Sequence, residues 1–398
     1  AHRSAFKSAT YRHYFPSAIF STLGSWTLRF LLGWSAWDLT ESATWVGVVA
    51  GLMLAPALVL SPLFGIVSDR INPRNGLLLT VCAHALLAGT AGVAVYAGVF
   101  TLPVLLALSM ALGIATSAHT PIRLALIPSL VPRESLPSAI GYSAIIFNTS
   151  RIVGPALGAW LLHSGSPTAA YFSGAVLMLG ALPFLVFIPG KTPERSRTSN
   201  TGFLRELGDG LRYTRSQDTI RQVLAFTLVN ALLGRTVIEL LPAVSGLLLT
   251  GDSATLATLT ACAGLGSILG GLLVSRQGGG QARLFRLTIA SLALGAMLIA
   301  ALGWLVDLRM VAAVIGAISL TTTVAGTSTQ ALAQLMVAED FRGRVLSLWT
   351  MIAMGGPAAG AIVMGRLGDA YPLSLVLLGF AVAALVALGW LAQRETRP

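Results

Sequence analysis

Four charged side chains lie near the middle of segments that are otherwise apolar, namely Arg29, Arg151, Arg235 and Glu239. A charge at the centre of a membrane helix costs about 2.5 to 3.5 kcal/mol on insertion scales, so such residues persist where they pair or function. In the stretch GRTVIELLP, Arg235 and Glu239 are four positions apart and can meet on one helical face. A salt bridge within that helix is one interpretation, and it leaves two arginines without a well-placed carboxylate.

These charges indicate two kinds of chemistry. Three arginines against one carboxylate favour an anionic ligand, particularly a carboxylate that arginine binds in bidentate fashion. A desolvated carboxylate held by arginines can take up and release a proton as its pairing changes, so Glu239 is the first candidate for proton coupling. Asp38, His84 and His119 are weaker candidates, and His119 is also a candidate substrate contact. A histidine in a membrane helix as often serves only to form a hydrogen bond to a neighbouring helix.

The composition is that of a membrane protein. Of the 398 residues, 55% are hydrophobic and 10% are charged, whereas a soluble domain is about one quarter charged. The net charge of +11 comes from basic residues scattered between apolar stretches, so we expect the lipid bilayer, and no nucleic acid, as partner. Cys82 and Cys262 lie far apart in apolar segments and indicate neither a disulfide framework nor a metal site.

Polar and Pro/Gly clusters divide the chain into twelve apolar pieces, each near the 20 or so residues that cross a membrane. The predicted spans are 15–38, 43–68, 76–99, 101–126, 137–163, 168–189, 220–249, 254–275, 284–306, 309–336, 343–368 and 371–392. One long polar stretch, residues 190–219, separates the first six from the last six. We therefore predict an N-terminal six-helix bundle (1–189), a linker with a short amphipathic helix (190–219) and a C-terminal six-helix bundle (220–398).

Lysine and arginine are distributed unevenly over the connecting segments. If both termini are cytoplasmic, the loops on the inner side hold 20 of the 26 basic residues, as the positive-inside rule requires. We therefore expect a multi-pass protein of the bacterial inner membrane with both termini in the cytoplasm. The amphipathic helix of the linker is then expected to rest on the inner headgroups.

The two halves of the chain contain an internal repeat. GIVSDR at 65–70 aligns with GLLVSR at 271–276 and Arg29 aligns with Arg235, each shifted by 206 positions; GPALG at 154–158 recurs as GPAAG at 356–360, shifted by 202. The alternative is that apolar, glycine-rich helices look alike. A parallel repeat predicts a substrate site between the halves near the midplane, with Glu239 shared between Arg29 and Arg235.

Several stretches resemble the major facilitator superfamily. Residues 65–74 are similar to its Gly-x-x-x-Asp-Arg loop signature, with Asn72 and Pro73 as departures, and GPALG resembles the core of its antiporter motif. LLGRTVIELLP, NTSRIVGPALG and FRGRVLSL resemble the branch that contains enterobactin-type siderophore exporters and macrolide efflux pumps. The resemblance covers essentially the whole chain. It implies an all-α membrane protein of twelve transmembrane helices arranged as two pseudo-symmetric six-helix bundles.

The resemblance also implies roles for particular residues. The loop after the second span is a cytoplasmic gate in the superfamily, which implies the gating residues Gly65, Asp69, Arg70 and Arg74, with Arg342 or Arg344 as partners. Spans 1, 4, 7 and 10 line the superfamily's cavity. The candidate substrate contacts are Arg29, Arg151, Arg235, Glu239, Trp26, Asn148, Asn230, His119, Thr327 and Gln330. The Gly-Pro-x-x-Gly residues Gly154, Pro155, Gly158, Gly356, Pro357 and Gly360 are expected to allow close helix packing.

The sequence contains no Walker loop, dinucleotide fingerprint, metal-spaced His/Cys set or nucleophile elbow, which disfavours an enzyme or an ATP-driven pump. We predict a monomeric, proton-coupled secondary exporter of a small anionic metabolite such as a siderophore. It would need no cofactor or metal beyond the proton gradient. The alternatives are a broad drug or macrolide efflux pump, a lipid or lysolipid transporter, and a membrane sensor that transports nothing.

Overall fold

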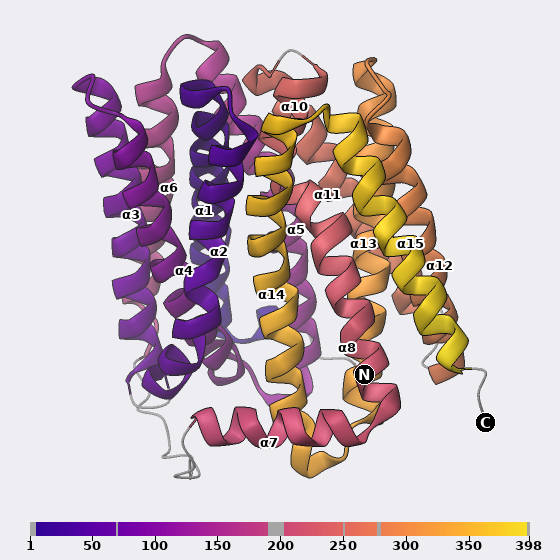
Figure 1. Ribbon diagram of the computed structural model, residues 1–398. Helices are drawn as coiled ribbons and strands as arrows, with labels where there is room; N and C mark the ends of the chain where they lie inside the picture. Colours follow the sequence, from indigo (N-terminus) through magenta and orange to yellow (C-terminus); the bar gives the residue numbers. More distant parts are fainter. Residues whose placement is uncertain (1–4, 69–70, 190–202, 250, 277–279, 396–398) are drawn as a thin grey trace. The chain divides into compact units, whose positions relative to one another are not determined.

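The computed structural model describes residues 5–68, 71–189, 203–249, 251–276 and 280–395, and these residues form helices joined by short turns, with no strand among them. The first helices along the chain are η1 (Ala5–Lys7), α1 (Ala9–Thr40), α2 (Ala43–Ser68), α3 (Pro73–Tyr96), α4 (Leu102–Leu130), η2 (Arg133–Ser135), α5 (Leu136–His163) and α6 (Pro167–Val186). They correspond in order to the first six predicted spans (Figure 1).

The later helices begin with α7 (Phe203–Ser216), at the place where the sequence predicts a short amphipathic helix. The predicted seventh span is divided into α8 (Asp218–Asn230), the π-helical turn η3 (Ala231–Arg235), α9 (Thr236–Glu239) and α10 (Leu241–Leu248). The remaining spans are α11 (Ser253–Arg276), α12 (Gln281–Leu302), α13 (Leu308–Met336), α14 (Glu339–Ala370) and α15 (Leu373–Glu395).

Eleven helical stretches of the described residues are long and apolar enough to cross a membrane. The 32-residue helix α1, which contains the first of the twelve predicted spans, is not among them. Serine, threonine and the charges of Arg29 and Asp38 dilute its apolar content. The first span therefore carries an unusually polar sequence, which is where functional side chains are expected in a membrane protein.

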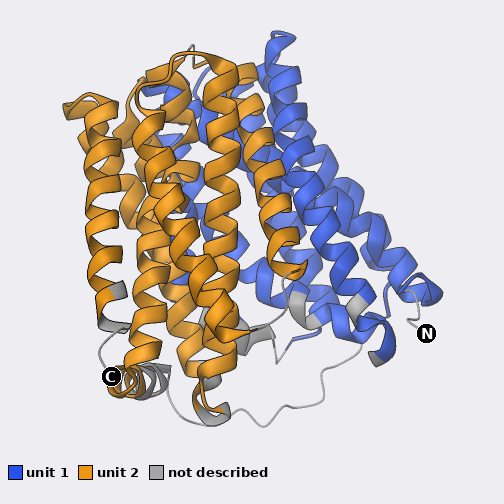
Figure 2. Ribbon diagram, turned by 90° about the vertical axis from the view of Figure 1, so that its right-hand side faces the viewer, with its two compact units in different colours: residues 1–40, 52–198 blue, residues 41–51, 199–398 orange. Residues whose placement is uncertain are grey.

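The chain divides into two compact units, shown in different colours in Figure 2. Unit 1 comprises residues 1–40 and 52–198, and unit 2 comprises residues 41–51 and 199–398. The continuous helix α2 is thus divided, because its first turns group with unit 2 and the rest with unit 1. The domain boundaries inferred from the sequence fall partly in residues 190–202, which lie outside the described part, and they stay a prediction.

The two residues that depart from the loop signature, Asn72 and Pro73, form the start of helix α3. Asn72 is its N-cap, and the Oδ1 atom of Asn72 accepts a hydrogen bond from the backbone N–H of Arg74 at 3.0 Å. Pro73 occupies the first helical position, where a missing N–H does no harm. The Arg74 side chain donates to the carbonyls of Leu185 (3.3 Å) and Val186 (2.7 Å), which belong to the last turn of α6. These contacts fix the start of α3 against the end of α6.

In unit 1, the Gly-Pro-x-x-Gly stretch of α5 packs closely on α1. A Cβ atom added to Gly154 would lie 2.9 Å from the Cβ of Trp26, and one on Gly158 would lie 3.0 Å from Cδ1 of Phe30. Pro155 lies between them inside the helix and is buried. Because no side chain separates the backbones here, α5 approaches α1 at the level of its candidate site residues.

In unit 2, the corresponding stretch of α14 packs on the divided seventh span. A Cβ atom added to Gly356 would lie 2.6 Å from the Cβ of Ala231, and one on Gly360 would lie 2.2 Å from Oγ1 of Thr236. Pro357 is buried inside α14. Position 236 is position 30 shifted by 206, so each unit makes the same contact at the positions that the sequence repeat aligns.

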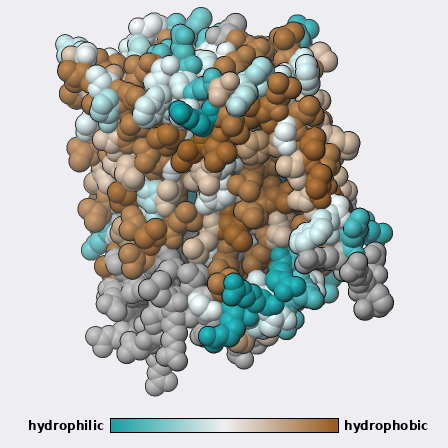
Figure 3. Space-filling view, viewed as in Figure 1, coloured by the Kyte–Doolittle hydropathy of each residue, from teal (hydrophilic) through white to brown (hydrophobic). Residues whose placement is uncertain are grey.

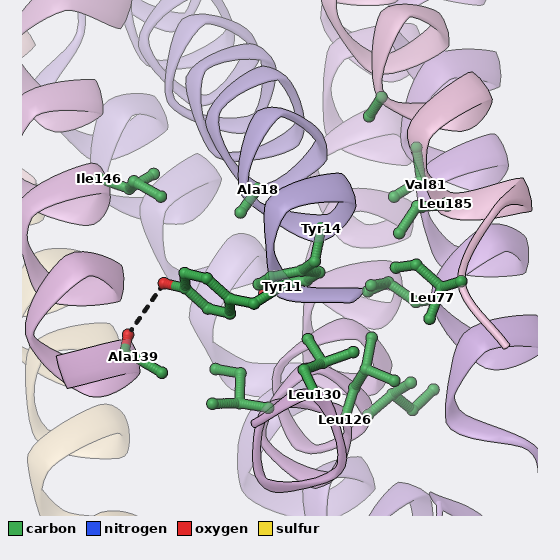
Figure 4. Packing of buried hydrophobic residues seen from close by; sticks show 14 of the residues in the cluster. Tyr11, Tyr14, Ala18, Leu77, Val81, Leu126, Leu130, Ala139, Ile146 and Leu185 are labelled. Carbon is green, nitrogen blue, oxygen red and sulfur yellow. Dashed lines mark hydrogen bonds between the residues drawn. The ribbon is translucent and has the colours of Figure 1, made fainter. Parts of the chain in front are cut away.

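The N-terminal end of α1 is anchored in a core cluster of unit 1 that also draws on α3, α4, α5 and α6. Tyr11 is fully buried there, and its hydroxyl donates to the carbonyl of Ala139 at 3.4 Å (Figure 4). Leu77 and Leu126 lie around the two buried rings of Tyr11 and Tyr14. Burial of these rings stabilises the entry of α1, which positions the polar part of the helix further along.

The outer faces of the helices are apolar. On the face shown in Figure 3, hydrophobic side chains cover the middle of the helices and hydrophilic ones gather toward their ends. The large exposed apolar residues include Val59, Leu79, Leu86, Val176 and Val386, each more than 60% exposed. Exposure of this kind suits contact with lipid chains and would be unfavourable in water.

The glycine contact of unit 2 generates a stability prediction. Replacing Gly360 by alanine would place a methyl group 2.2 Å from the Thr236 hydroxyl, and we expect this overpacking to destabilise the protein by about 1–3 kcal/mol. The matched control is Gly379→Ala in α15, where an added Cβ meets nothing within 4 Å. Both changes raise helix propensity equally, so a lower Tm in detergent for Gly360→Ala alone is the expected result. Equal Tm values would contradict the contact.

Candidate functional site

A cluster of aromatic and basic side chains lies between α1 and α5 in unit 1. The guanidinium carbons of Arg29 and Arg151 lie 6.0 Å and 5.8 Å from the centroid of the Trp26 ring. Phe147 meets the same indole edge-on, with ring centroids 5.4 Å apart. Arg29 and Trp26 come from α1, whereas Phe147 and Arg151 are one helical turn apart on α5. We call these four residues the Trp26 cluster.

The Trp26 cluster concentrates positive charge inside an apolar bundle. Arg151 is only 8% exposed, and both it and Arg29 lie within about 6 Å of the centroid of the same indole ring. A cation over an aromatic face gains about 0.5–2 kcal/mol, more as water is excluded. Two guanidinium groups beside one aromatic ring form a positively charged region, which suits an anionic group.

The second cluster lies where the seventh span is least regular. Helix α8 ends at Asn230, η3 follows as a π-helical turn, and α9 ends at Glu239 before α10 begins at Leu241. The Thr236 hydroxyl donates to the carbonyl of Ala231, five residues earlier, at 2.9 Å. Pro242 lies in the first turn of α10. Its missing N–H allows the chain to turn at Leu240 without losing a donor.

Arg235 and Glu239 lie at the two ends of this short, interrupted segment. Arg235 Nη2 is 3.3 Å from Glu239 Oε1, and the side chains are 35% and 9% exposed, respectively. The predicted pairing within the helix is therefore present. The carboxylate is the more buried partner, so the stability of its ionised form depends on the charges and hydrogen bonds around it. Interrupted helices at mid-membrane are where transporters commonly bind ions and substrates.

Helix α13 packs directly against this segment. The side-chain amide of Asn230 donates to the carbonyl of Thr322 at 3.1 Å, and Asn230 is 9% exposed. A Cβ atom on Gly234 would lie 2.1 Å from Oγ1 of Thr322, so a larger residue at that position would have to displace the Thr322 hydroxyl. Asn230 thus holds α8 to α13 one turn before Arg235. We call Asn230, Arg235, Glu239, Thr236 and Thr322 the Glu239 cluster.

Other candidate residues occupy different surroundings. The Asn148 amide donates to the carbonyl of Ala144 in its own helix at 2.8 Å, while Thr327, Gln330 and Asp38 are exposed on α13 and α1. His119 Nδ1 lies 3.0 Å from the Thr80 hydroxyl, and the rings of His119 and His84 are 5.5 Å apart. The histidines therefore join α3 to α4. Sequence reasoning missed Phe147 and Thr236.

The predicted gate is described only in part. Asp69 and Arg70 lie outside the described residues, as does the side chain of Arg342; Gly65 lies in the last turns of α2. Arg344 lies over the ring of Phe341 at 5.2 Å, and Phe341 stacks on Tyr213 of α7 with centroids 4.3 Å apart. Figure 1 shows α7 crossing the end of α14 at which that helix starts. Among the described residues, no group of His, Cys, Asp and Glu could hold a metal ion.

The sequence is similar over nearly its whole length to a known protein family. Residues 2–396 match the family model of the transmembrane secretion effectors, a group within the major facilitator superfamily. The chain is 25% identical over 180 residues to a staphyloferrin A transporter of Staphylococcus aureus, which covers 44% of this chain and 43% of that protein. It is 27% identical over 264 residues to macrolide efflux protein A of Streptococcus pyogenes, 64% of each chain. The alignments thus span less than two thirds of these relatives.

Solved structures show the same fold at low identity. The nucleoside transporter NupG superposes with a TM-score of 0.72 at 16% identity, covering 96% of this chain and 99% of that one. A POT family transporter in complex with 5-aminolevulinic acid gives a TM-score of 0.72 at 14% identity, covering 97% and 96%. At these identities the likeness concerns the fold alone. The predicted all-helical major facilitator fold is confirmed.

The buried pair generates a second prediction. In the single variant Arg235→Met, the Glu239 carboxylate remains buried without its arginine, and we expect a loss of about 1–3 kcal/mol. Adding Glu239→Gln removes the buried charge and should restore part of the Tm in detergent. The exposed pair of Asp218 and Arg221 is the control, because Arg221→Met and Asp218→Asn should combine additively. Additive effects at Arg235 and Glu239 as well would contradict a coupled pair.

Proposed function

The chain belongs to the transmembrane secretion effector family of the major facilitator superfamily, and from this premise we propose that it is a proton-coupled exporter of a small anionic metabolite. Transport would follow alternating access across the bacterial inner membrane. Among anionic metabolites we favour a siderophore. The observation that carries the proposal is the Arg235–Glu239 pair at the interruption of the seventh span.

Proton coupling rests on the surroundings of Glu239. Its side chain is 9% exposed and paired at 3.3 Å with an arginine that is itself 35% exposed. Protonation of Glu239 would break the pair, and the ionised pair re-forms only when that proton leaves. A substrate that binds more tightly while the pair is ionised would therefore favour loss of the proton, and a proton taken up from the other side would favour release of the substrate. Exchange of a proton against the substrate then follows because binding of one weakens binding of the other.

Anion selectivity rests on the Trp26 cluster. Arg29 and Arg151 lie within about 6 Å of one indole ring, and Phe147 closes one side of it. Guanidinium groups bind carboxylates through two parallel hydrogen bonds, and aromatic faces accept planar ligands. An anionic ligand with a flat, apolar part would satisfy both features. The proton gradient suffices as energy source in this scheme, with no cofactor and with the monomer as transporting unit.

A second candidate function is efflux of macrolides. Macrolide efflux is favoured by the alignment with macrolide efflux protein A. That alignment extends over more residues of this chain than the alignment with the staphyloferrin A transporter. The two arginines of the Trp26 cluster argue against a cationic drug as the preferred substrate, because they would repel it. Transport assays with compounds of both kinds separate the two candidates.

The coupling proposal predicts the behaviour of Glu239→Gln. In proteoliposomes with an imposed pH gradient, the variant should lose uphill transport of the anion while retaining counterflow, because glutamine cannot carry the proton. Glu134→Gln is the control, since Glu134 is an exposed carboxylate in η2. Staphyloferrin A and a macrolide serve as probes. Uphill transport that persists in Glu239→Gln would remove this residue from the coupling step.

The selectivity proposal predicts the behaviour of Arg29→Gln and Arg151→Gln. Loss of a bidentate contact to a carboxylate, worth about 1.5–3 kcal/mol, should raise the KM for an anionic siderophore about tenfold or more. The KM for a macrolide should change little. Arg309→Gln, an exposed residue in the first turn of α13, is the control. Equal changes for both probes would contradict an anion site at the Trp26 cluster.

A further inference from the structure

A carboxylate at the end of α14 caps the beginning of α2. Asp369 Oδ1 accepts a hydrogen bond from the backbone N–H of Ala43 at 2.7 Å, and Oδ2 accepts from the N–H of Thr44 at 3.0 Å. The Ser42 hydroxyl donates to Oδ2 at 2.5 Å. The first N–H groups of a helix have no partner inside it, and the helix dipole favours an anion there. Asp369 therefore supplies the N-terminal cap of a helix more than 300 residues away in the sequence.

Glycine contacts bring the two helices together at the same place. A Cβ atom on Gly365, one turn before Asp369, would lie 2.3 Å from the carbonyl oxygen of Ala43. A Cβ atom on Gly47 of α2 would lie 2.1 Å from the carbonyl oxygen of Ala361. The backbones are therefore in direct contact over the first turns of α2 and the last turns of α14. Small residues on both sides allow this approach.

Other aspartate caps in the described chain are local. Asp307 accepts hydrogen bonds from the N–H groups of Arg309 and Met310 at 3.0 Å and 3.1 Å, at the start of its own helix α13. Such a cap stabilises one helix and moves with it. The Asp369 cap joins two helices instead, so it breaks whenever α2 and α14 move apart.

The division of α2 shows where such a movement would act. Residues 43–51 of α2 group with unit 2 through contacts such as these, whereas the residues from 52 onward group with unit 1. The spacing Gly365-x-x-x-Asp369 at the end of α14 also repeats the spacing Gly65-x-x-x-Asp69 at the other end of α2. The sequence thus carries the same glycine-to-aspartate spacing where α14 ends and where α2 ends.

We propose that Asp369 and Gly365 form a latch that holds the first turns of α2 against α14 and must open in each transport cycle. The proposal rests on the proposed function, since a latch matters only to a protein that alternates between conformations. With the predicted orientation, this end of α2 faces the outside of the cell. Loss of the carboxylate charge removes the attraction to the helix N-terminus, and asparagine would turn an N–H group toward one of the three donors.

The test measures the separation of α2 and α14 directly. In a background with Cys82→Ala and Cys262→Ala, spin labels are attached to Val48→Cys and Arg366→Cys, and their distance distribution is recorded in proteoliposomes. Asp369→Asn should raise the ratio of long to short distances about tenfold, as expected for the loss of charge-assisted hydrogen bonds. Asp307→Asn, which removes a cap of the same chemistry within one helix, should leave the distribution unchanged.

A second pair of variants keeps the test decisive if Asp369→Asn does not fold. Gly365→Ala should shift the distribution in the same direction, because its methyl group would collide with the Ala43 carbonyl, whereas Gly379→Ala should not. A distribution unchanged in Asp369→Asn and Gly365→Ala, or shifted equally by Asp307→Asn, would overturn the latch. The readout needs no substrate, so a shift in a protein that shows no proton-linked transport would support the latch while the transport proposal fails.

Discussion

Hydrocarbon offers no hydrogen bonds and no counter-ions, so every polar group that these helices carry into the membrane must be satisfied by the protein. The Glu239 carboxylate forms an ion pair with Arg235, on a segment whose helix is interrupted on both sides. The side-chain amide of Asn230 donates a hydrogen bond to the carbonyl of Thr322. Groups that depend on one another in this way cannot be changed singly. In the proposed mechanism, a proton on Glu239 and the ionised pair with Arg235 exclude each other, and this competition is what would couple substrate to proton.

Glycines decide which helices can meet at these polar groups. In unit 1, Gly154 lets α5 approach α1 beside Trp26, and in unit 2, Gly360 lets α14 approach the segment that carries Arg235. In both units, a close backbone approach thus lies beside candidate site residues. Gly365 extends the pattern to the end of α14, where the neighbour is the first turn of α2. Close packing and polar chemistry thus occur together, because short distances make hydrogen bonds and ion pairs strong.

Much of the fold could be predicted from the sequence, because lipid imposes long apolar segments and the repeat fixes their correspondence. The spacing of Arg235 and Glu239 was enough to predict their pair. Phe147 could not be foreseen beside Trp26, since the contact depends on the rotation of α5 about its axis, and no local pattern reports that rotation. The π-helical turn at 231–235 was missed because its stabilising bond, from Thr236 to Ala231, looks like any threonine in a helix. Pro242 was the available signal for the interruption after Glu239.

The role of Asp369 illustrates the same limit, because its partners at 42–44 are more than 300 positions away and only the folded chain brings them together. The central claim remains that Glu239 exchanges its arginine for a proton. Purified protein in weakly buffered detergent solution, with a pH indicator present, tests it most directly when staphyloferrin A is added. The claim predicts release of a proton upon binding, which is absent in Glu239→Gln although the compound still binds. Release of the same size in the variant would contradict it.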